Sequence, residues 1–144
     1  MSVWSQSCER YLKSPIIVAT VILFLSCNTQ QDRRDAEEKA SRIHAQLQRG
    51  DFLSIYGESS SGFKQVGNES TFITGMQRFL KENGSLKTAT EVAYLASFDS
   101  NAGRTHTLIF DLEFERGRAK ERMIFVRSSN GQMELWDLSV DPIQ

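Results

Sequence analysis

The chain has 144 residues, of which 40% are hydrophobic, and its 17 Lys and Arg nearly balance its 18 Asp and Glu. This length and composition are typical of a single globular domain. The charge balance excludes a nucleic-acid binder that relies on a strongly basic surface. The two cysteines, Cys8 and Cys27, are too few for a disulfide framework or a cysteine-based zinc site.

The first pattern along the chain is an apolar run from Ile16 to Leu25, which follows Arg10 and Lys13. A membrane-spanning helix needs about 20 apolar residues, so this run is too short to cross a bilayer. Its length and the basic residues before it match a secretory signal. The end of a buried helix, and a signal without further modification, are the alternatives that the residues leave open.

The run ends in Phe24-Leu-Ser-Cys27, which resembles the lipobox of bacterial lipoproteins with phenylalanine in place of the usual leucine. The resemblance implies a diacylglyceryl group on Cys27, removal of residues 1–26, and a fatty acid such as palmitate on the new amino terminus. Two or more acyl chains hold a protein on a membrane where one does not. We therefore expect a signal peptide at 1–26, a short tether at 27–31 and one domain at 32–144.

The same resemblance implies a location in the cell envelope, with the lipid anchor on the periplasmic or extracytoplasmic side. Asn28 follows the cysteine, whereas an aspartate in that place favours retention in the inner membrane of Gram-negative bacteria. The outer membrane is therefore slightly favoured.

A first helix is predicted from Asp32 to Arg49, ended by Gly50. Apolar residues recur along one side of it at helical spacing. This stripe consists of Ala36, Ala40, Ile43 and Leu47. A stripe this thin is typical of a helix that lies across a surface.

Two further helices are predicted before residue 85. Asp51 is suited to cap a short helix, a loop follows at 57–62, and a longer helix runs from Asn68 to Asn83 and ends at Gly84. The longer helix has a strong apolar face. The apolar residues of the two helices are Phe52, Ile55 and Tyr56 in the first, and Phe72, Ile73, Met76, Phe79 and Leu80 in the second.

From Ser85 onward the apolar period changes to two, which predicts strands. We expect four of them, at Leu86–Phe98, Arg104–Glu115, Ala119–Arg127 and Met133–Val140. Turns are predicted at Asn101-Ala-Gly103, Gly117-Arg118 and Asn130-Gly131, the last two as two-residue hairpins. The fold class is therefore α+β, with N-terminal helices packed on a curved four-stranded antiparallel meander sheet.

The predicted turns specify a register between neighbouring strands. They place Phe110 opposite Phe125, Glu113 opposite Arg122, and Phe125 opposite Trp136, so that aromatic residues and opposite charges meet. A slip of one residue would exchange the two faces of the sheet. The predicted inner wall consists of Val92, Tyr94, Ala96, Phe98, Leu108, Phe110, Leu112, Phe114, Met123, Phe125, Trp136 and Leu138.

Three helices followed by a four-stranded meander resemble the cone-shaped α+β fold of the nuclear-transport-factor-2-like (cystatin-like) group. The segments Gly50–Tyr56, Phe63-Lys64 and Phe79–Leu86 are similar to uncharacterised bacterial envelope proteins of this type. The resemblance implies a curved sheet wrapped on a long helix, with a cone that is either filled or open to a small apolar ligand. A fold of this kind does not define a function.

We expect a membrane-anchored module that binds a small ligand or a protein partner. The candidate pocket residues are Tyr56, Phe79, Tyr94, Phe110, Phe125 and Trp136. An apolar strip on the outer sheet face is a candidate homodimer surface. This strip consists of Ile109, Ile124, Val126 and Leu135. The alternative is a small isomerase or dehydratase that uses Tyr56, Tyr94 or Glu121.

No catalytic motif, glycine-rich phosphate loop or metal-ligand spacing stands out in the sequence. The two histidines, His44 and His106, lie far apart, and no carboxylate stands at ligand spacing from either. His106 is next to a predicted turn and is expected to be exposed. We therefore expect no cofactor, no metal and no nucleic-acid partner.

Overall fold

The computed structural model describes the backbone of residues 15–143 and the side chains of residues 29–143. Contacts divide the described chain into two units, which meet between Asp32 and Arg33. In the first unit the described residues are helical, and the second unit holds the sheet and the whole of the described core.

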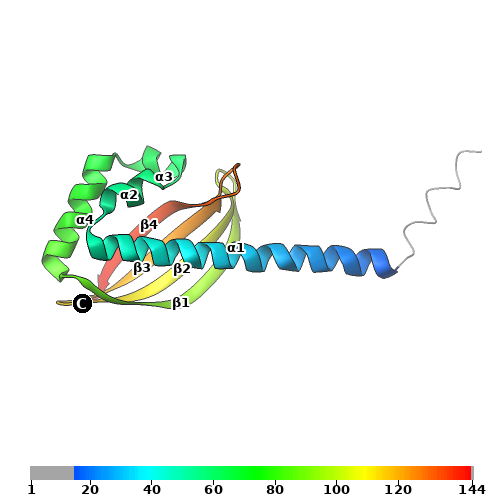
Figure 1. Ribbon diagram of the computed structural model, residues 1–144, viewed down its shortest axis with the longest axis horizontal. Helices are drawn as coiled ribbons and strands as arrows, with labels where there is room; N and C mark the ends of the chain where they lie inside the picture. Colours follow the sequence, from blue (N-terminus) through cyan, green and yellow to red (C-terminus); the bar gives the residue numbers. More distant parts are fainter. Residues whose placement is uncertain (1–14, 144) are drawn as a thin grey trace, which may run out of the picture. The chain divides into compact units, whose positions relative to one another are not determined.

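Four helices precede four strands in the described chain (Figure 1). The helices are α1 (Pro15–Arg49), α2 (Phe52–Gly57), α3 (Ser61–Val66) and α4 (Glu69–Asn83). The strands are β1 (Leu86–Asp99), β2 (Gly103–Phe114), β3 (Arg118–Arg127) and β4 (Met133–Ile143). They form one antiparallel sheet in the order β1-β2-β3-β4, with β1 and β4 at its open edges. The predicted α+β meander is therefore confirmed.

The first helix begins at Pro15, well before the predicted start at Asp32. Proline is tolerated in the first turn of a helix, and residues 16–49 contain no glycine or proline that would interrupt it. In the described part of the chain, no helix is long and apolar enough to span a membrane.

The ends of α1 and α4 are formed by glycines, as predicted. Gly50 has a φ of 69°, its N–H donates to the carbonyl of Leu47, and the N–H of Asp51 donates to the carbonyl of Gln46. This pair of bonds is the Schellman arrangement that ends many helices. Gly84 follows α4 with a φ of 81°.

The helix α3 was not predicted, because its six residues are too few for a clear apolar period. Ser60 begins it by accepting a hydrogen bond from the Phe63 N–H at 3.2 Å. Within α3, Gly62 lies against the ring of Trp136, so closely that an added Cβ would come within 2.1 Å of a ring carbon. Glycine is therefore required at this contact between α3 and β4.

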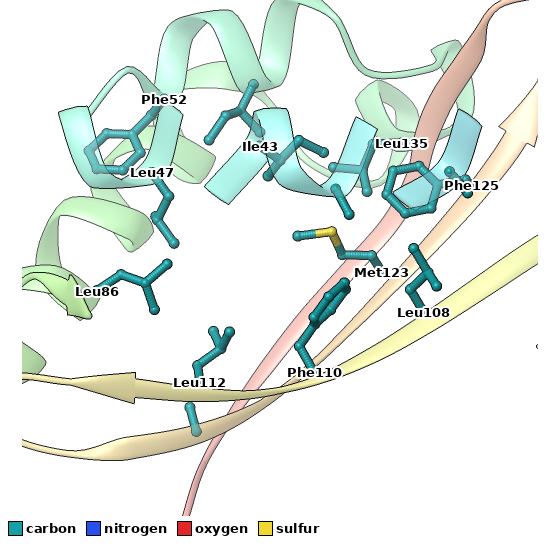
Figure 2. Packing of buried hydrophobic residues seen from close by; sticks show 14 of the residues in the cluster. Ile43, Leu47, Phe52, Leu86, Leu108, Phe110, Leu112, Met123, Phe125 and Leu135 are labelled. Carbon is teal, nitrogen blue, oxygen red and sulfur yellow. The ribbon is translucent and has the colours of Figure 1, made fainter. Parts of the chain in front are cut away.

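The stripe of α1 lies in the centre of the core, so the prediction that this helix lies across a surface is wrong. Ala36 and Ala40 are fully buried, and their small side chains let the helix approach the sheet closely. Three polar residues beside the stripe, Lys39, His44 and Gln46, are buried as well. Figure 2 shows core side chains of α1, α2 and the sheet lying in the space between these elements.

The predicted register between β2 and β3 is wrong. Phe110 lies opposite Glu121 and Asp111 lies opposite Lys120, because the chain reverses through residues 115 and 116 rather than at Gly117-Arg118. Gly117 does not have a positive φ. An added Cβ there would lie 2.9 Å from the Asn83 side chain, so the glycine serves close approach to the end of α4. The observed partner of Phe110 lies four residues from the predicted one. Because this number is even, the side chains stay on the faces of the sheet that were predicted for them.

A bulge in the β3–β4 ladder overturns the predicted pairing of Phe125 with Trp136. The register shifts between Ile124 and Phe125, and Phe125 pairs with Leu135. Leu135 is fully buried, whereas Trp136 is half-buried. The prediction that Leu135 lies on the outer face is therefore wrong, because the extra residue of the bulge exchanges the faces near the turn.

The inner wall is formed mainly by β2 and β3. Leu108, Phe110, Leu112, Phe114, Met123 and Phe125 are buried as predicted. The edge strand β1 contributes less than expected, because it has two register shifts of its own. Val92 falls at one of these shifts, and the Phe98 side chain is 80% exposed.

Candidate functional site

Two clefts lie on opposite sides of α1. The larger, which we call the polar groove, has a volume of about 1020 Å³ and lies between α1, the segment that joins α2 to α3, and the β3–β4 hairpin. The smaller, which we call the histidine cleft, has a volume of about 340 Å³ and lies between α1 and strands β1 and β2. Ligand sites in proteins commonly have volumes of about 300–1,000 Å³.

The walls of the polar groove are held in place by backbone contacts. The Ser60 N–H donates to the Leu135 carbonyl at 2.9 Å, which ties the start of α3 to β4. The Gly62–Trp136 contact supports the same junction. In the hairpin, Ser128 N–H donates to the Gln132 carbonyl at 2.9 Å. The groove is therefore framed by defined turns.

Charges of both signs line the polar groove. Glu58 accepts hydrogen bonds from Lys39 Nζ at 2.7 Å and from Gln46 Nε2 at 3.1 Å. The hydrogen bond from Lys39 holds the pKa of Glu58 below its usual value, with smaller contributions from the Lys39 charge, Gln46 and Arg42. Arg42 Nη2 lies 3.5 Å from Glu38 Oε1, and Arg42 Nη1 lies 3.9 Å from Glu58 Oε2.

The remaining groove residues are mostly hydroxyl- and amide-bearing. The polar and charged residues that line it are Asp35, Glu38, Lys39, Arg42, Glu58, Ser59, Ser60, Ser61, Lys64, Ser128, Ser129, Asn130, Gln132 and Glu134. Trp136 supplies its one aromatic side chain. The acidic and basic side chains nearly balance, so the groove offers both donors and acceptors without a strong net charge.

One residue that lines the histidine cleft, His44, makes a buried contact with Glu121. His44 Nε2 lies 2.6 Å from Glu121 Oε2, and Glu121 is only 1% exposed. The ring of His44 meets Phe110 edge to face, with centroids 4.8 Å apart. The cleft above is lined by Glu37, Ser41, His44, Ala45, Gln48, Ala89, Glu91 and Phe110.

Arg33 organises the rim of the histidine cleft. Its Nε donates to Glu37 at 2.6 Å and its Nη2 donates to Glu91 at 3.1 Å. Its guanidinium carbon lies 4.9 Å from the centre of the Tyr94 ring. The Tyr94 hydroxyl in turn hydrogen-bonds His106 Nδ1 at 2.8 Å. Both carboxylates on the rim are thus held by one guanidinium.

The six candidate pocket residues do not share one site. Trp136 lines the polar groove and Phe110 lines the histidine cleft. Phe125 is fully buried in the core. Phe79 packs against that core, and Tyr94 stacks on His106. Tyr56 donates its hydroxyl hydrogen to the Gly67 carbonyl at 3.0 Å, which is a packing role near α2.

Two further expectations about position are wrong. His106 is 1% exposed, because it shares the inner face of β2 with Leu108 and lies opposite the buried Phe125. The outer apolar strip is not continuous, since Leu135 and Val126 are buried while Ile109 and Ile124 are half-buried. The lipidation predicted at Cys27 concerns a side chain outside the described residues and stays a prediction.

The pairing of His44 with Glu121 was not predicted, although both residues carried a signal. Glu121 alternates with Ala119 and Met123 and therefore falls on the inner face. His44 lies one position after Ile43 in the buried stripe. Only the three-dimensional crossing of α1 over β3 brings the two side chains together.

Among residues 29–143, no group of three or more His, Cys, Asp and Glu side chains is placed to hold a metal ion. A comparison with known proteins finds no family model that matches the chain and no curated protein with significant similarity to it.

Proposed function

We propose that this chain is a lipid-anchored module of the bacterial cell envelope that binds a small polar ligand in the polar groove. The observation that carries the proposal is the groove itself, an open cleft of about 1020 Å³ with walls held by backbone hydrogen bonds. Sites with preformed walls lose less ordering entropy on binding.

The lining of the groove selects the chemistry of the ligand. Lys39 and Arg42 lie beside Glu58 and Glu38, so a strongly charged ligand that approaches either base or either acid on this wall meets a like charge next to it. Serine hydroxyls and the amides of Asn130 and Gln132 both donate and accept hydrogen bonds. The ligand class is therefore neutral or zwitterionic, such as a sugar or a short peptide.

An apolar ligand inside the cone is less well supported. The space between α1 and the sheet is occupied by core side chains, including Leu108, Met123 and Phe125 (Figure 2). Protein interiors are packed without voids of ligand size. A ligand is thus expected outside the core, in a cleft with polar walls.

The anchoring part of the proposal rests on the lipobox resemblance at Phe24–Cys27. Metabolic labelling with a radioactive fatty acid tests it, with the full chain expressed in a bacterium. Cys27→Ala should abolish labelling and Cys8→Ala should keep it, because a small residue precedes both cysteines but only Cys27 also follows the apolar run Ile16–Leu25. Equal labelling of the two variants would remove the anchor from the proposal.

The binding part is tested by titration calorimetry with residues 28–144, which contain the whole described core. The probes are N-acetylglucosamine, alanyl-alanine and, as an apolar comparison, palmitate. Ser129→Trp places a bulky ring in the groove from the exposed β3–β4 turn. Ser100→Trp is the matched control, since it makes the same change in the exposed β1–β2 turn.

A polar probe should bind the wild type, and Ser129→Trp should weaken its binding at least about tenfold, or about 1.4 kcal/mol. Ser100→Trp should leave the affinity unchanged. Binding of palmitate alone, or an equal loss in both variants, would contradict the proposal.

A further inference from the structure

The contact between His44 and Glu121 has the geometry of an oriented base. His44 Nε2 lies 2.6 Å from a carboxylate that is 1% exposed. A carboxylate only accepts hydrogen bonds, so in a neutral His44 that donates to it Nε2 carries the proton and Nδ1 carries the lone pair. The edge of Phe110 packs against the ring and restricts its rotation.

The second ring nitrogen is available to the cleft. His44 lines the histidine cleft, and Nδ1 has no hydrogen-bond partner among residues 29–143. Nδ1 is also not among the buried polar atoms without a partner in that part of the chain, so it reaches the surface of the cleft. A ring nitrogen of His44 therefore faces a space of about 340 Å³.

We propose that the histidine cleft is a proton-transfer site in which His44 is the base and Glu121 is its positioning residue. Nδ1 takes a proton from a bound hydroxyl, amine or activated water, and the buried carboxylate stabilises the imidazolium that forms. As that proton leaves, the oxygen or nitrogen that carried it bonds to an acyl carbon of an ester. The bond from that carbon to the ester oxygen breaks, and the proton passes from His44 to the released oxygen, so no oxidant is needed. This role for a carboxylate beside a histidine follows the general logic of acid–base triads.

The rim of the cleft indicates the substrate class. Glu37 and Glu91 present carboxylate oxygens, and Ser41 and Gln48 present a hydroxyl and an amide. These groups accept hydrogen bonds, and they lie on the same side of α1 as His44. The substrate is thus a small compound with hydroxyl or amine donors, and this site is separate from the polar groove.

Chemical labelling of the native chain tests the availability of His44 without any variant. Diethyl pyrocarbonate forms a bond from an imidazole nitrogen to its carbonyl carbon and releases ethyl carbonate, which takes up the imidazole proton and decays to ethanol and carbon dioxide. The chain has only two histidines, so His106, which is 1% exposed and bonded to Tyr94, is an internal control. Peptide mapping should find His44 modified at least about tenfold faster, as expected for an accessible base.

The basicity of His44 is tested with p-nitrophenyl acetate, whose hydrolysis a positioned base accelerates by removing a proton from the attacking water. His44→Gln should lower the rate above buffer at least about tenfold, at the low end of general-base effects. His106→Gln is the matched control and should stay within about twofold. Glu121→Gln should lower kcat, and Glu121→Asp should restore part of it.

Each outcome decides for or against the proposal. Equal labelling of the two histidines, or a rate that His44→Gln and His106→Gln change alike, would show that the pair only pins α1 to β3. A loss in Glu121→Gln that Glu121→Asp does not recover would remove the positioning role. Thermal unfolding of every variant confirms that the comparison is between folded proteins.

Discussion

The close contact between Gly62 and the Trp136 ring predicts that a larger residue at position 62 lowers the free energy of unfolding. An added Cβ at residue 62 would lie 2.1 to 2.6 Å from three carbons of the indole ring. Carbon atoms in good contact are about 3.5 Å apart, so the ring or α3 must retreat by roughly 1.4 Å. Overpacking of this kind costs about 1–3 kcal/mol. Alanine also restricts the unfolded chain more than glycine does, which offsets about 0.4–1 kcal/mol of this cost. The difference between the central values of the two ranges is about 1.3 kcal/mol, so Gly62→Ala should destabilise the protein by about that amount.

Gly75→Ala is the matched control for this substitution. Gly75 lies in α4 with no atom within 4 Å of an added Cβ, so alanine there should stabilise the protein by about 0.5–1 kcal/mol. Urea unfolding measures both changes as shifts of the midpoint at constant slope. The reasoning is refuted if Gly62→Ala is as stable as the wild type, or if the two substitutions change stability in the same direction.

Two further predictions concern the ion pair at Glu58 and the bulge in β4. The pKa of Glu58 is held below its usual value by Lys39, so its contribution to stability is present above about pH 4.5 and is lost as the pH falls further through the folded-state pKa. The effect should be small because the side chain is 42% exposed, and urea midpoints across the acid range should become less pH-dependent in Glu58→Gln. Leu135→Ala should lower the free energy of unfolding by about 2–5 kcal/mol. Leu95→Ala, at a 61% exposed position, is the control and should change it by no more than about 0.5 kcal/mol. Similar losses in the two variants would mean that the bulge does not turn Leu135 inward.

Local signals were enough to predict the elements with strong caps. Asn68 accepts a hydrogen bond from the Thr71 N–H at 2.8 Å and begins α4, and Gly84 ends it with a positive φ. Both roles depend on residues within a few positions of each other. The change to a period of two after Ser85 likewise identified all four strands of the meander.

The predicted strand register was wrong at the places where residues distant in the sequence determine the backbone conformation. Gly117 looked like a turn residue, but its lack of a side chain serves the approach of Asn83 from α4. The bulge beside Phe125 turns Leu135 inward and leaves Trp136 to pack on Gly62. Neither contact is visible in the local pattern, because each joins segments that are far apart in the chain.

The candidate sites also combine features that nearby residues determine with features that depend on contacts between distant segments. The inward position of Glu121, which is 1% exposed, agrees with its alternation with Ala119 and Met123 along β3. Its partner His44 comes from α1, and the polar groove depends on how α1, α3 and the β3–β4 hairpin meet. The sequence left open whether the cone is filled or holds a ligand, and the packing of Phe125 and its neighbours fills it.

The most direct measurement of the central claim is an amide chemical-shift map of isotope-labelled residues 28–144, titrated with the polar probe that binds best. The account predicts saturable shifts that cluster at residues 57–61 and 128–132, the two segments that face each other across the groove, and that are absent in Ser129→Trp. Shifts confined to the outer sheet face or to the edge strand β1 would contradict the claim that the polar groove is the ligand site.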